Sequence, residues 1–307
     1  MTVTASMVKE LRELSGAGMS ACKNALVESN GDIARAVEIL REKGLAAAAK
    51  KAGRIAAEGL VMSALSDDRK KGALVEVNSE TDFVAKNEDF IGFVKNVAAQ
   101  ALASSAGTVE EMLAEKWVAD SGTTLQDVLT QKIATIGENI GIRRFERYNV
   151  SGNGLVVDYI HGGGRVGVML ELAADSVSDE VIEAGRNVCM QIAAMSPQFV
   201  DRNAVPEEYL AKEREILTQQ TMAEGKPANI AEKMVEGRLN KMLKEICLVD
   251  QEYVKDGELT VGKYLDTVAK AAGGKLSVAR YVRYEKGEGI EKKEENFAEE
   301  VSKAMQG

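Results

Sequence analysis

The sequence predicts an α+β protein, in which a small helical domain precedes a core of antiparallel hairpins and helices. Two observations predict this class. Apolar residues recur at helical spacing over residues 1 to 45, whereas farther along the chain short apolar segments read as strands joined by polar turns. The chain has 307 residues, which at ~100–200 residues per domain predicts more than one packed unit.

The composition is that of a globular protein with an acidic balance. Hydrophobic residues make up 45% of the chain, and 48 Asp and Glu against 39 Lys and Arg give a formal net charge of −9. Because neutralising nucleic-acid phosphates needs surplus Lys and Arg, we expect no direct nucleic-acid partner. No stretch approaches the ~18 apolar residues of a membrane span, so we expect a soluble, cytoplasmic protein with no membrane contact.

The cysteines indicate neither a disulfide framework nor a metal site. They stand far apart, in no C-x-x-C spacing, at Cys22, Cys189 and Cys247. Such isolated cysteines are typical of reduced thiols in a protein core. The sequence also lacks clusters of metal-ligating residues, and we therefore expect no metal and no cofactor.

Residues 1–55 predict a three-helix domain and a linker. The expected helices end at Gly16, Asn30 and Gly44, and Asp32 is placed to cap the third. The apolar residues expected to face the core are Val8, Leu11, Leu14, Met19, Cys22, Leu26, Ile33, Val37 and Leu40. A basic, alanine-rich helix after Gly44 is expected to link this domain to the rest.

Residues 56–151 predict the first subdomain of the core. Its expected elements are two strands and three capped helices, namely strands 58–65 and 73–78 and helices that begin after Asn87, Thr108 and Thr124. At Thr108 the pattern predicts a capping box with Glu111. The apolar face of the first helix is expected to consist of Phe90, Phe93, Val94, Val97 and Ala101.

Residues 152–201 and 249–286 predict a second subdomain on the same plan. Its expected elements are strands 155–161 and 165–172, a helix from Ser178, a helix at 261–272 and a strand at 276–284. The helix from Ser178 should turn inward Val181, Val188, Ile192 and Met195. Placing Gly72 beside Gly167, an offset of 95 positions, aligns strand with strand and helix with helix. A duplicated hairpin-plus-helix core favours a broad docking surface over a deep pocket.

Two segments depart from this plan. Residues 202–248 predict an inserted antiparallel helical hairpin, in which Pro206 begins the first helix and Gly225-Lys226-Pro227 separates the two. Residues 287–307 predict a C-terminal helical module with one apolar stripe, formed by Phe297, Val301 and Met305. That stripe is expected to dock on this protein or on a partner.

The sequence offers little catalytic chemistry. His161 is the one histidine of the chain, and no G-x-S-x-G motif accompanies it. A structural or interface role is favoured for it, with a hydrolase or transferase that uses His161 as the alternative. Gly162 to Gly167 match G-x-G-x-x-G, but strands are expected on both sides, which favours a hairpin turn over a nucleotide site.

The loop Ser79–Val84 is the segment that most suggests function. It places a large aromatic, Phe83, beside a carboxylate, Asp82, directly after a strand and before a capped helix. One interpretation puts Phe83 in the core and makes Asp82 a local cap. The other makes the pair a wedge, in which Phe83 enters an apolar slot on a partner and Asp82 disturbs the charge there.

Several blocks of the sequence carry a family resemblance. They are LRELSGAGMSACKNALVESNGDIARAVEILREKG, KKAGRIAAEGLV, NSETDFVAKNEDF, IGENIGIRR, HGGGRVGV, GKPANIAEKMVEGR and YVRYEKGEGIEK. In this order, over nearly the whole chain, they resemble bacterial elongation factor Ts. The block TDFVA after a strand is specific when it occurs with the others.

The resemblance implies a translation elongation factor that acts as a guanine-nucleotide exchange factor without bond-making chemistry of its own. Its partner would be the GDP-bound GTPase elongation factor Tu. The factor would promote GDP release by displacing Mg²⁺ from the GTPase, and GTP would then displace the factor. The family's N-terminal domain, similar to ubiquitin-associated domains, and its C-terminal module contact the GTPase. The 206–247 hairpin is associated with a homodimer.

Residue by residue, the resemblance implies two sets of site residues. Those expected to dislodge Mg²⁺ from the partner GTPase are Thr81, Asp82, Phe83 and Val84. Those expected to bind the partner elsewhere are Met19, Lys23 and His161. The alternative function is an adaptor of the ubiquitin-associated type, in which residues 1–45 carry most of the affinity and nucleotide release is unaffected.

Overall fold

The computed structural model describes residues 3–224 and 228–291, apart from the side chains of residues 228–230. These residues form helices and small antiparallel sheets, which confirms the predicted α+β class. The expected stop at Gly225-Lys226-Pro227 and the expected stripe of the C-terminal module lie outside the described residues.

The chain divides into two compact units, each made of more than one segment. The first holds the residues up to Met62, Val75–Phe145 and the chain from Glu285 on, and the second holds Ser63–Leu74 and Glu146–Tyr284. The finer division into five parts that the sequence suggests stays a prediction.

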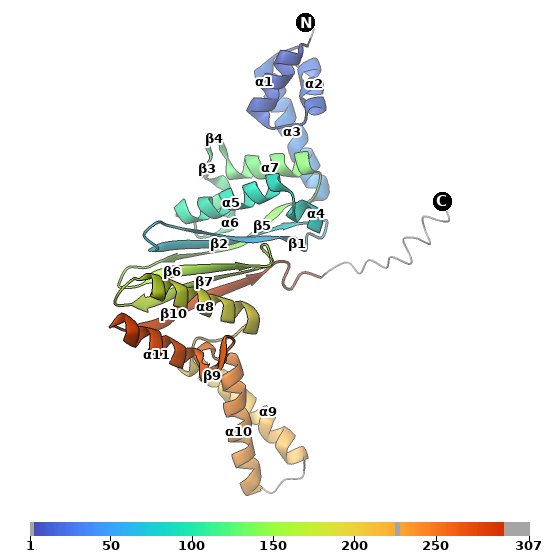
Figure 1. The fold of residues 1–307 in the computed structure, drawn as a ribbon. Helices are drawn as coiled ribbons and strands as arrows, with labels where there is room; N and C mark the ends of the chain where they lie inside the picture. The colour runs from blue at the N-terminus through green and yellow to red at the C-terminus, as the bar shows by residue number, and fades with distance from the viewer. Residues whose placement is uncertain (1–2, 225–227, 292–307) are drawn as a thin grey trace. The chain divides into compact units, whose positions relative to one another are not determined.

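Three helices open the first unit: α1 Ala5–Ser15, α2 Met19–Glu28 and α3 Ile33–Lys51 (Figure 1). The side chains of Thr4 and Asp32 cap α1 and α3, and Gly16 ends α1 in the left-handed conformation. The buried residues recur at helical spacing and are Val8, Leu11, Cys22, Ala25, Leu26, Ala36 and Ile39. Three of the residues expected in this core are wrong, because Leu14 is 65%, Met19 48% and Val37 37% exposed. Each short helix turns only a narrow stripe inward.

The expected end of the third helix at Gly44 is wrong, since α3 continues to Lys51. Gly44 is buried against α7, Leu125–Ile136, where a Cβ atom would lie 3.5 Å from the Thr130 side chain. That distance is an ordinary van der Waals contact, so Gly44 is an interior residue of the helix and does not end it. The Lys51 ammonium group donates to the carbonyl oxygen of Ile133 in the last turn of α7.

The first sheet has the strand order β1-β2-β5, with β1 Glu58–Leu65, β2 Lys71–Ser79 and β5 Gly141–Asn149. Helices α5, Glu88–Ala103, and α7 cover one face of it (Figure 1). The face of α5 predicted to be apolar is buried, which confirms that prediction. Between these helices lie α6 Val109–Ala114 and a small hairpin of β3 Lys116–Trp117 and β4 Asp120–Thr124.

Two local expectations for this region need correction. Thr108 caps α6 by accepting from the Glu111 N–H, but the Glu111 carboxylate binds the N–H of Gly107, so the predicted capping box is only half formed. A full capping box instead joins Thr124 and Asp127 at the start of α7. The small hairpin and β5 were not predicted, because their residues are mostly polar or charged and show no clear alternation.

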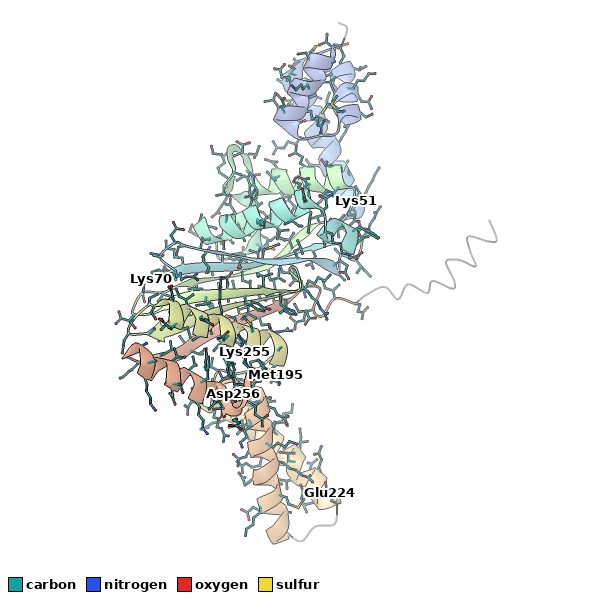
Figure 2. All side chains as sticks on the ribbon, viewed as in Figure 1. Lys51, Lys70, Met195, Glu224, Lys255 and Asp256 are labelled. Atoms are coloured by element: carbon teal, nitrogen blue, oxygen red, sulfur yellow. The ribbon has the colours of Figure 1, made fainter. Side chains whose placement is uncertain are left out.

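The second sheet has the order β10-β7-β6, with β6 Leu155–His161, β7 Val166–Ala174 and β10 Leu276–Glu285. The pairing runs from Leu155 with Leu172 to His161 with Val166, so the glycine-rich segment between them is the predicted hairpin turn. Helices α8 Asp179–Met195 and α11 Val261–Ala272 pack on this sheet, and β8 Glu252–Tyr253 pairs with β9 Asp256–Thr260. Met195, expected inward, is half exposed in the last turn of α8 (Figure 2).

The two sheets share detailed features as well as strand order. In each, the second strand of the hairpin lies between the first strand and the last one. Gly59 and Gly154 hold matching places with positive φ, since a Cβ atom at either would collide with a carbonyl oxygen, that of Val77 or that of Leu172. Glycine is required at both because the facing backbone passes so close.

A buried glutamine repeats in the same way. Gln100 in α5 accepts from the N–H of Val118 at 2.7 Å, and Gln191 in α8 accepts from the N–H of Val254 at 2.8 Å. Val118 and Val254 each stand between the two strands of a small hairpin. Each buried glutamine thus ties a hairpin to the helix beneath it through a hydrogen bond from a backbone N–H group.

The two halves differ in two insertions. Strands β2 and β7 begin 95 positions apart, at Lys71 and Val166, but helices α5 and α8 begin 91 apart, at Glu88 and Asp179. The single offset predicted for strands and helices is therefore wrong for the helices. The difference is the four-residue helix α4, Asp82–Ala85, which stands between β2 and α5, whereas α8 directly follows the loop after β7.

The second insertion is a pair of long helices, α9 Glu207–Ala223 and α10 Ala228–Ile246, where the first half has α6. Pro206 is the residue before the first helical residue of α9, one place earlier than predicted. The hairpin packs through an apolar cluster of Val205, Leu239, Leu243 and Cys247, with Phe199, Tyr209, Leu210 and Leu217 against it. Short 3-10 helices flank it at Arg202–Ala204 and Leu248–Asp250.

The described residues also bear on two compositional expectations. Cys22, Cys189 and Cys247 are buried and free, as expected of core thiols. Over residues 3–224 and 228–291, no helix combines the length and the apolar character needed to cross a bilayer.

We predict that Gln191→Ala destabilises the protein. It removes a buried side chain that accepts from the N–H of Val254 and donates to the buried side chain of Gln251, and a buried polar partner left unsatisfied costs about 1–3 kcal/mol. Urea denaturation followed by circular dichroism measures the loss. Gln219→Ala, which removes an exposed glutamine from α9, is the control and should change the free energy of unfolding by less than about 0.5 kcal/mol. Equal effects of the two substitutions would contradict the assignment.

Candidate functional site

The candidate site is the turn of chain between β2 and α5. It holds the short helix α4, which Thr81 caps by accepting from the N–H of Val84. Asn87 then caps α5 by accepting from the N–H groups of Asp89 and Phe90. Capping residues thus stand at both ends of the segment, and a four-residue helix lies between them.

The carboxylate of Glu138 clamps the start of this segment. Its Oε2 accepts from the N–H of Glu80 at 3.0 Å and from the N–H of Thr81 at 3.1 Å. Its Oε1 accepts from the Thr81 hydroxyl at 2.6 Å. Hydrogen bonds to an ionised carboxylate are stronger than neutral ones, so these three bonds fix the backbone just before Phe83.

The loop in turn binds the segment that contains Glu138, through the side chain of Glu80. The Glu80 carboxylate accepts from the N–H of Asn139 at 2.5 Å and pairs with Arg54 at 3.4 Å. The Asn139 amide donates to the backbone carbonyl of Arg54 at 2.7 Å. Sequence reasoning missed Glu138 as a site residue, although it directly follows Gly137, the left-handed residue that ends α7. The signal available in the sequence was a carboxylate residue, Glu138, directly after the glycine that ends a helix.

Phe83 is 80% exposed, so the interpretation that placed it in the core is wrong. Ala85 is the buried residue of α4. An isolated exposed apolar side chain is common in proteins. What distinguishes Phe83 is that the backbone beneath it is held by the bonds to Glu138, so the ring stands out from a fixed base.

Asp82 stays near the surface beside Phe83. Its carboxylate accepts from the Lys86 ammonium group at 2.6 Å, one turn along the chain. That hydrogen bond, with the added positive charges of Lys86 and Lys286, holds the pKa of Asp82 below its ordinary value. The site therefore presents an ionised carboxylate next to an apolar ring at neutral pH.

Of the residues expected to bind a partner elsewhere, two lie on the N-terminal helices. Met19 and Lys23 are both exposed on α2, four residues apart, and so share one face of that helix. Val27, one turn farther along α2, is also exposed. Together they form an exposed strip of apolar and basic character.

His161 ends β6 in the second unit and is exposed. Its Nδ1 lies 2.9 Å from the hydroxyl of Tyr159, and the two rings are 5.8 Å apart. This contact orients the imidazole but supplies neither a nucleophile nor a carboxylate for the hydrolase alternative. In the part of the chain that the structure describes, His, Cys, Asp and Glu side chains gather nowhere as a group of three that could hold a metal ion.

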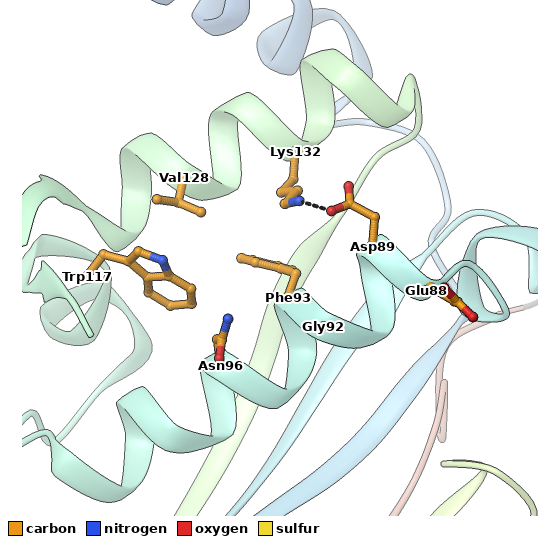
Figure 3. A pocket seen from close by; sticks show the side chains of 8 residues that line it. All are labelled: Glu88, Asp89, Gly92, Phe93, Asn96, Trp117, Val128 and Lys132. Atoms are coloured by element: carbon orange, nitrogen blue, oxygen red, sulfur yellow. Dashed lines mark hydrogen bonds and ion pairs between the residues drawn. The ribbon is translucent and has the colours of Figure 1, made fainter. Parts of the chain in front are cut away.

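A cavity of about 290 Å³ lies between α5, α7 and β3 (Figure 3). Phe93 and Trp117 line it with ring centroids 6.0 Å apart, and Lys132 pairs with Asp89 at 2.7 Å on its edge. Its lining residues include none of the expected site residues. The site singled out by the sequence is thus a projecting loop and not a pocket.

Comparisons with known proteins identify the family of the chain. A family model described as Elongation factor TS matches residues 80–288. The chain is 56% identical over 301 residues to elongation factor Ts of Clostridium perfringens (strain SM101 / Type A), covering 98% of both chains. It is 55% identical over 304 residues to elongation factor Ts of Clostridium acetobutylicum and 54% identical over 303 residues to that of Clostridioides difficile (strain 630), covering 99% of the chains in each case.

These matches place the chain in the class of translation elongation factors. Within that class it belongs to the elongation factor Ts family, as the resemblance read from the sequence indicated.

We predict that Glu138→Ala loosens the loop that carries Phe83. The N–H groups of Glu80 and Thr81 lose their acceptor, so their amide hydrogens should exchange with solvent at least about tenfold faster, as expected when a charge-assisted bond is lost. Hydrogen–deuterium exchange read by NMR measures this. Glu110→Ala, at an exposed position of α6, is the control and should leave both rates unchanged. Unchanged rates in Glu138→Ala would remove Glu138 from the site.

Proposed function

We propose that this protein is the guanine-nucleotide exchange factor of the translational GTPase elongation factor Tu. In this proposal it binds the GDP-bound GTPase and promotes GDP release by displacing Mg²⁺ and loosening the phosphate contacts, and GTP then displaces it. The observation that carries the proposal is Phe83, exposed beside the ionised Asp82 on a loop that Glu138 holds in place. Family membership supports the choice of partner.

Thr81, Asp82, Phe83 and Val84 have distinct parts in this mechanism. Thr81 caps α4 and binds Glu138, so it positions the other three. Phe83 enters between packed side chains of the GTPase and shifts the element that orients the Mg²⁺ ligands. Asp82 brings a negative charge to a place where the GTPase uses a cation to offset phosphate oxygens. Val84, half-buried directly after Phe83 in α4, is proposed to add an apolar side chain to the same contact.

Rigidity of the loop matters for the energetics. Prying apart packed side chains needs free energy, which must come from the rest of the interface. A loop that is already ordered in the free protein loses little conformational entropy on binding, so more of the interface energy remains for distorting the partner. The bonds from Glu138 supply this order before the partner arrives.

Exchange then follows from thermodynamic linkage. If the factor weakens nucleotide binding by a given free energy, nucleotide weakens factor binding by the same amount. Incoming GTP therefore expels the factor and completes the cycle. In this scheme the protein makes and breaks no bond itself, and its place of action is the cytoplasm, where its partner works.

Two further contacts are part of the proposal. Met19 and Lys23 lie on one exposed face of α2, which suits the three-helix domain, similar to ubiquitin-associated domains, to a second contact with the GTPase. His161, exposed at the end of β6, is proposed as a contact from the second half of the core. We also propose that the two halves arose as copies of one hairpin-plus-helix unit, since they share strand order and the glycine and glutamine pairs.

We predict that Phe83→Ala and Asp82→Ala each slow GDP release stimulated by this protein by about tenfold or more. Each substitution removes a side chain that is proposed to distort the Mg²⁺ site of the GTPase. Release of fluorescent GDP from purified elongation factor Tu measures the rate. Melting temperature and circular dichroism should stay nearly unchanged, because both residues lie near the surface.

Val177→Ala is the matched control for Phe83→Ala. Val177 is an exposed apolar residue in the loop between β7 and α8, the counterpart in the second half of the loop that carries Phe83. Its loss should leave GDP release at the wild-type rate. If the Phe83→Ala protein stimulates GDP release as fast as the wild type, the wedge mechanism is refuted. If the wild-type protein itself has no effect on GDP release, the exchange function is refuted and the adaptor alternative is favoured.

We further propose that the α9–α10 hairpin pairs with a second copy of the chain. Ile216 and Met222 are exposed apolar residues of α9. We predict a dimer by light scattering, at twice the 33.0 kDa chain mass, and a monomer for the double variant Ile216→Glu with Met222→Glu, because buried carboxylates oppose association. The double variant Gln219→Glu with Gln220→Glu adds the same charge to α9 and should stay dimeric. A monomeric wild type would contradict this proposal.

A further inference from the structure

The cavity between α5, α7 and β3 has no part in the proposed exchange function. Its volume is about 290 Å³, whereas a cavity of about 150 Å³ is enough to hold benzene. Phe93 and Trp117 line it, and Asn96 points toward the space between their rings (Figure 3). Both rings are buried and Asn96 is exposed, so the cavity is apolar inside and polar at its rim. It has room for one aromatic ring with a small substituent.

The second half of the core repeats the elements that surround this cavity. Helix α8 begins 91 positions after α5, and β8, β9 and α11 begin 136 positions after β3, β4 and α7, respectively. The two small hairpins also pair in one register, since Trp117 faces Asp120 and Tyr253 faces Asp256. Residues at these offsets can therefore be compared directly. The counterparts are Tyr253 for Trp117, Tyr264 for Val128, Asn187 for Asn96 and Ala184 for Phe93.

In the second half, a tyrosine ring takes the place that corresponds to the cavity. Tyr264 stacks on Tyr253, with ring centroids 4.4 Å apart and ring planes inclined by 14°. The Asn187 amide donates to the Tyr264 hydroxyl at 2.9 Å. The ring is therefore held by a stack on its face and by a hydrogen bond at its edge, the two contacts that a buried phenol needs.

The first half covers its own aromatic side chain less completely. The rings of Phe93 and Trp117 have centroids 6.0 Å apart and are inclined by 35°, so they are tilted and not stacked. Val128 lines the cavity at the position from which Tyr264 projects in the second half, but it carries no ring. The place of a stacked ring on Trp117 is thus left to the cavity.

The amide at the rim also differs between the halves in its neighbours. Asn187 accepts from the ammonium group of Lys255 at 2.7 Å, besides its bond to the tyrosine hydroxyl. The places of the lysine and the tyrosine are taken by Ala119 and Val128, which carry no polar side chain. Neither partner of Asn187 therefore has a counterpart beside Asn96.

The charges at the rim favour a ligand without a negative charge. The Lys132 ammonium group pairs with the Asp89 carboxylate at 2.7 Å, so these two charges offset each other (Figure 3). Glu88 adds a further carboxylate to the lining. An anionic ligand would meet this surplus negative charge, whereas an uncharged ring would not.

We propose that the cavity binds a small, uncharged, planar aromatic molecule of the phenol class. Its ring stacks on Trp117 as Tyr264 stacks on Tyr253, and its hydroxyl group accepts from the Asn96 amide. The second half shows that this chemistry fits, because it supplies such a ring from its own chain. The volume suits one ring with a small substituent, which favours a free molecule over a side chain that brings its backbone with it. The inference is independent of the partner GTPase.

We predict that 4-methylphenol binds the full-length chain with a dissociation constant of about 1 mM or lower, as expected for a well-held ligand of one ring. Trp117 is the one tryptophan of the chain, so its indole N–H signal in NMR reports binding at the cavity. That signal should shift and saturate. The anion 4-hydroxybenzoate should bind at least about fivefold more weakly. A signal that does not move up to about 10 mM 4-methylphenol overturns the proposal.

The ring of the second half can be moved into the first half as a test. The double variant Phe93→Ala with Val128→Tyr gives the first half the alanine and the tyrosine that the second half has. Its own tyrosine should then fill the cavity, and 4-methylphenol should bind about tenfold or more weakly. Wild-type affinity in a folded double variant overturns the proposal, since the ligand would then lie elsewhere.

A variant at the exposed rim keeps the test valid if the double variant does not fold. Asn96→Ala should weaken 4-methylphenol binding about fivefold, the size of one hydrogen bond, and should change toluene binding by less than about twofold. Lys95→Ala, at the neighbouring exposed position of α5, is the matched control and should leave both affinities unchanged. Equal affinity of Asn96→Ala and the wild type for 4-methylphenol contradicts the proposed contact.

A last comparison distinguishes a free molecule from a protein side chain. N-acetyltyrosinamide carries the same phenol ring with a peptide backbone attached. It should bind at least about tenfold more weakly than 4-methylphenol, because the cavity has no room for the backbone. If the two bind equally well, a tyrosine side chain of another protein is the occupant, and the proposal of a free molecule is overturned.

Discussion

The display of Phe83 depends on the carboxylate of Glu138. Backbone N–H groups at the end of a strand need acceptors, and an open loop would take them from water and stay free to fold its aromatic ring onto the sheet. Glu138 satisfies the N–H groups of Glu80 and Thr81, and Glu80 returns a bond to the N–H of Asn139. The two segments hold each other, and the ring stands on a base that is ordered without a partner.

The two halves of the core share several structural features, and each half also has features that the other lacks. Close-packed glycines, a buried glutamine beneath each small hairpin and a Glu–Arg pair between neighbouring strands occur in both halves. The additions are α4 with Phe83, the α9–α10 hairpin and the donors around Glu76. The first two additions coincide with proposed contacts.

Local signals in the sequence predicted most elements well. The caps at Asp32, Asn87 and Thr124 and the hairpin at the glycine turn were confirmed, because each depends on residues within a few positions of one another. Strand β5 was missed, since its arginines read as a polar segment until their partner Glu76 on the neighbouring strand is known. Leu14 and Met195 were wrongly placed inward, because periodicity gives the apolar face of a helix but not how wide a stripe its neighbours cover.

By itself the sequence determined most of the helices and strands, indicated a core of two similar halves, and placed Asp82 and Phe83 together on the loop after β2. Only the tertiary structure decided that Phe83 is exposed, that Glu138 holds the loop, and that Glu76 binds the turn at residues 285–290. The reason is separation along the chain: Thr81 and Glu138 are 57 residues apart, and Glu76 and Gly287 are 211 apart. Periodicity and capping act over a few residues, whereas partners so distant are chosen by how the strands and helices pack.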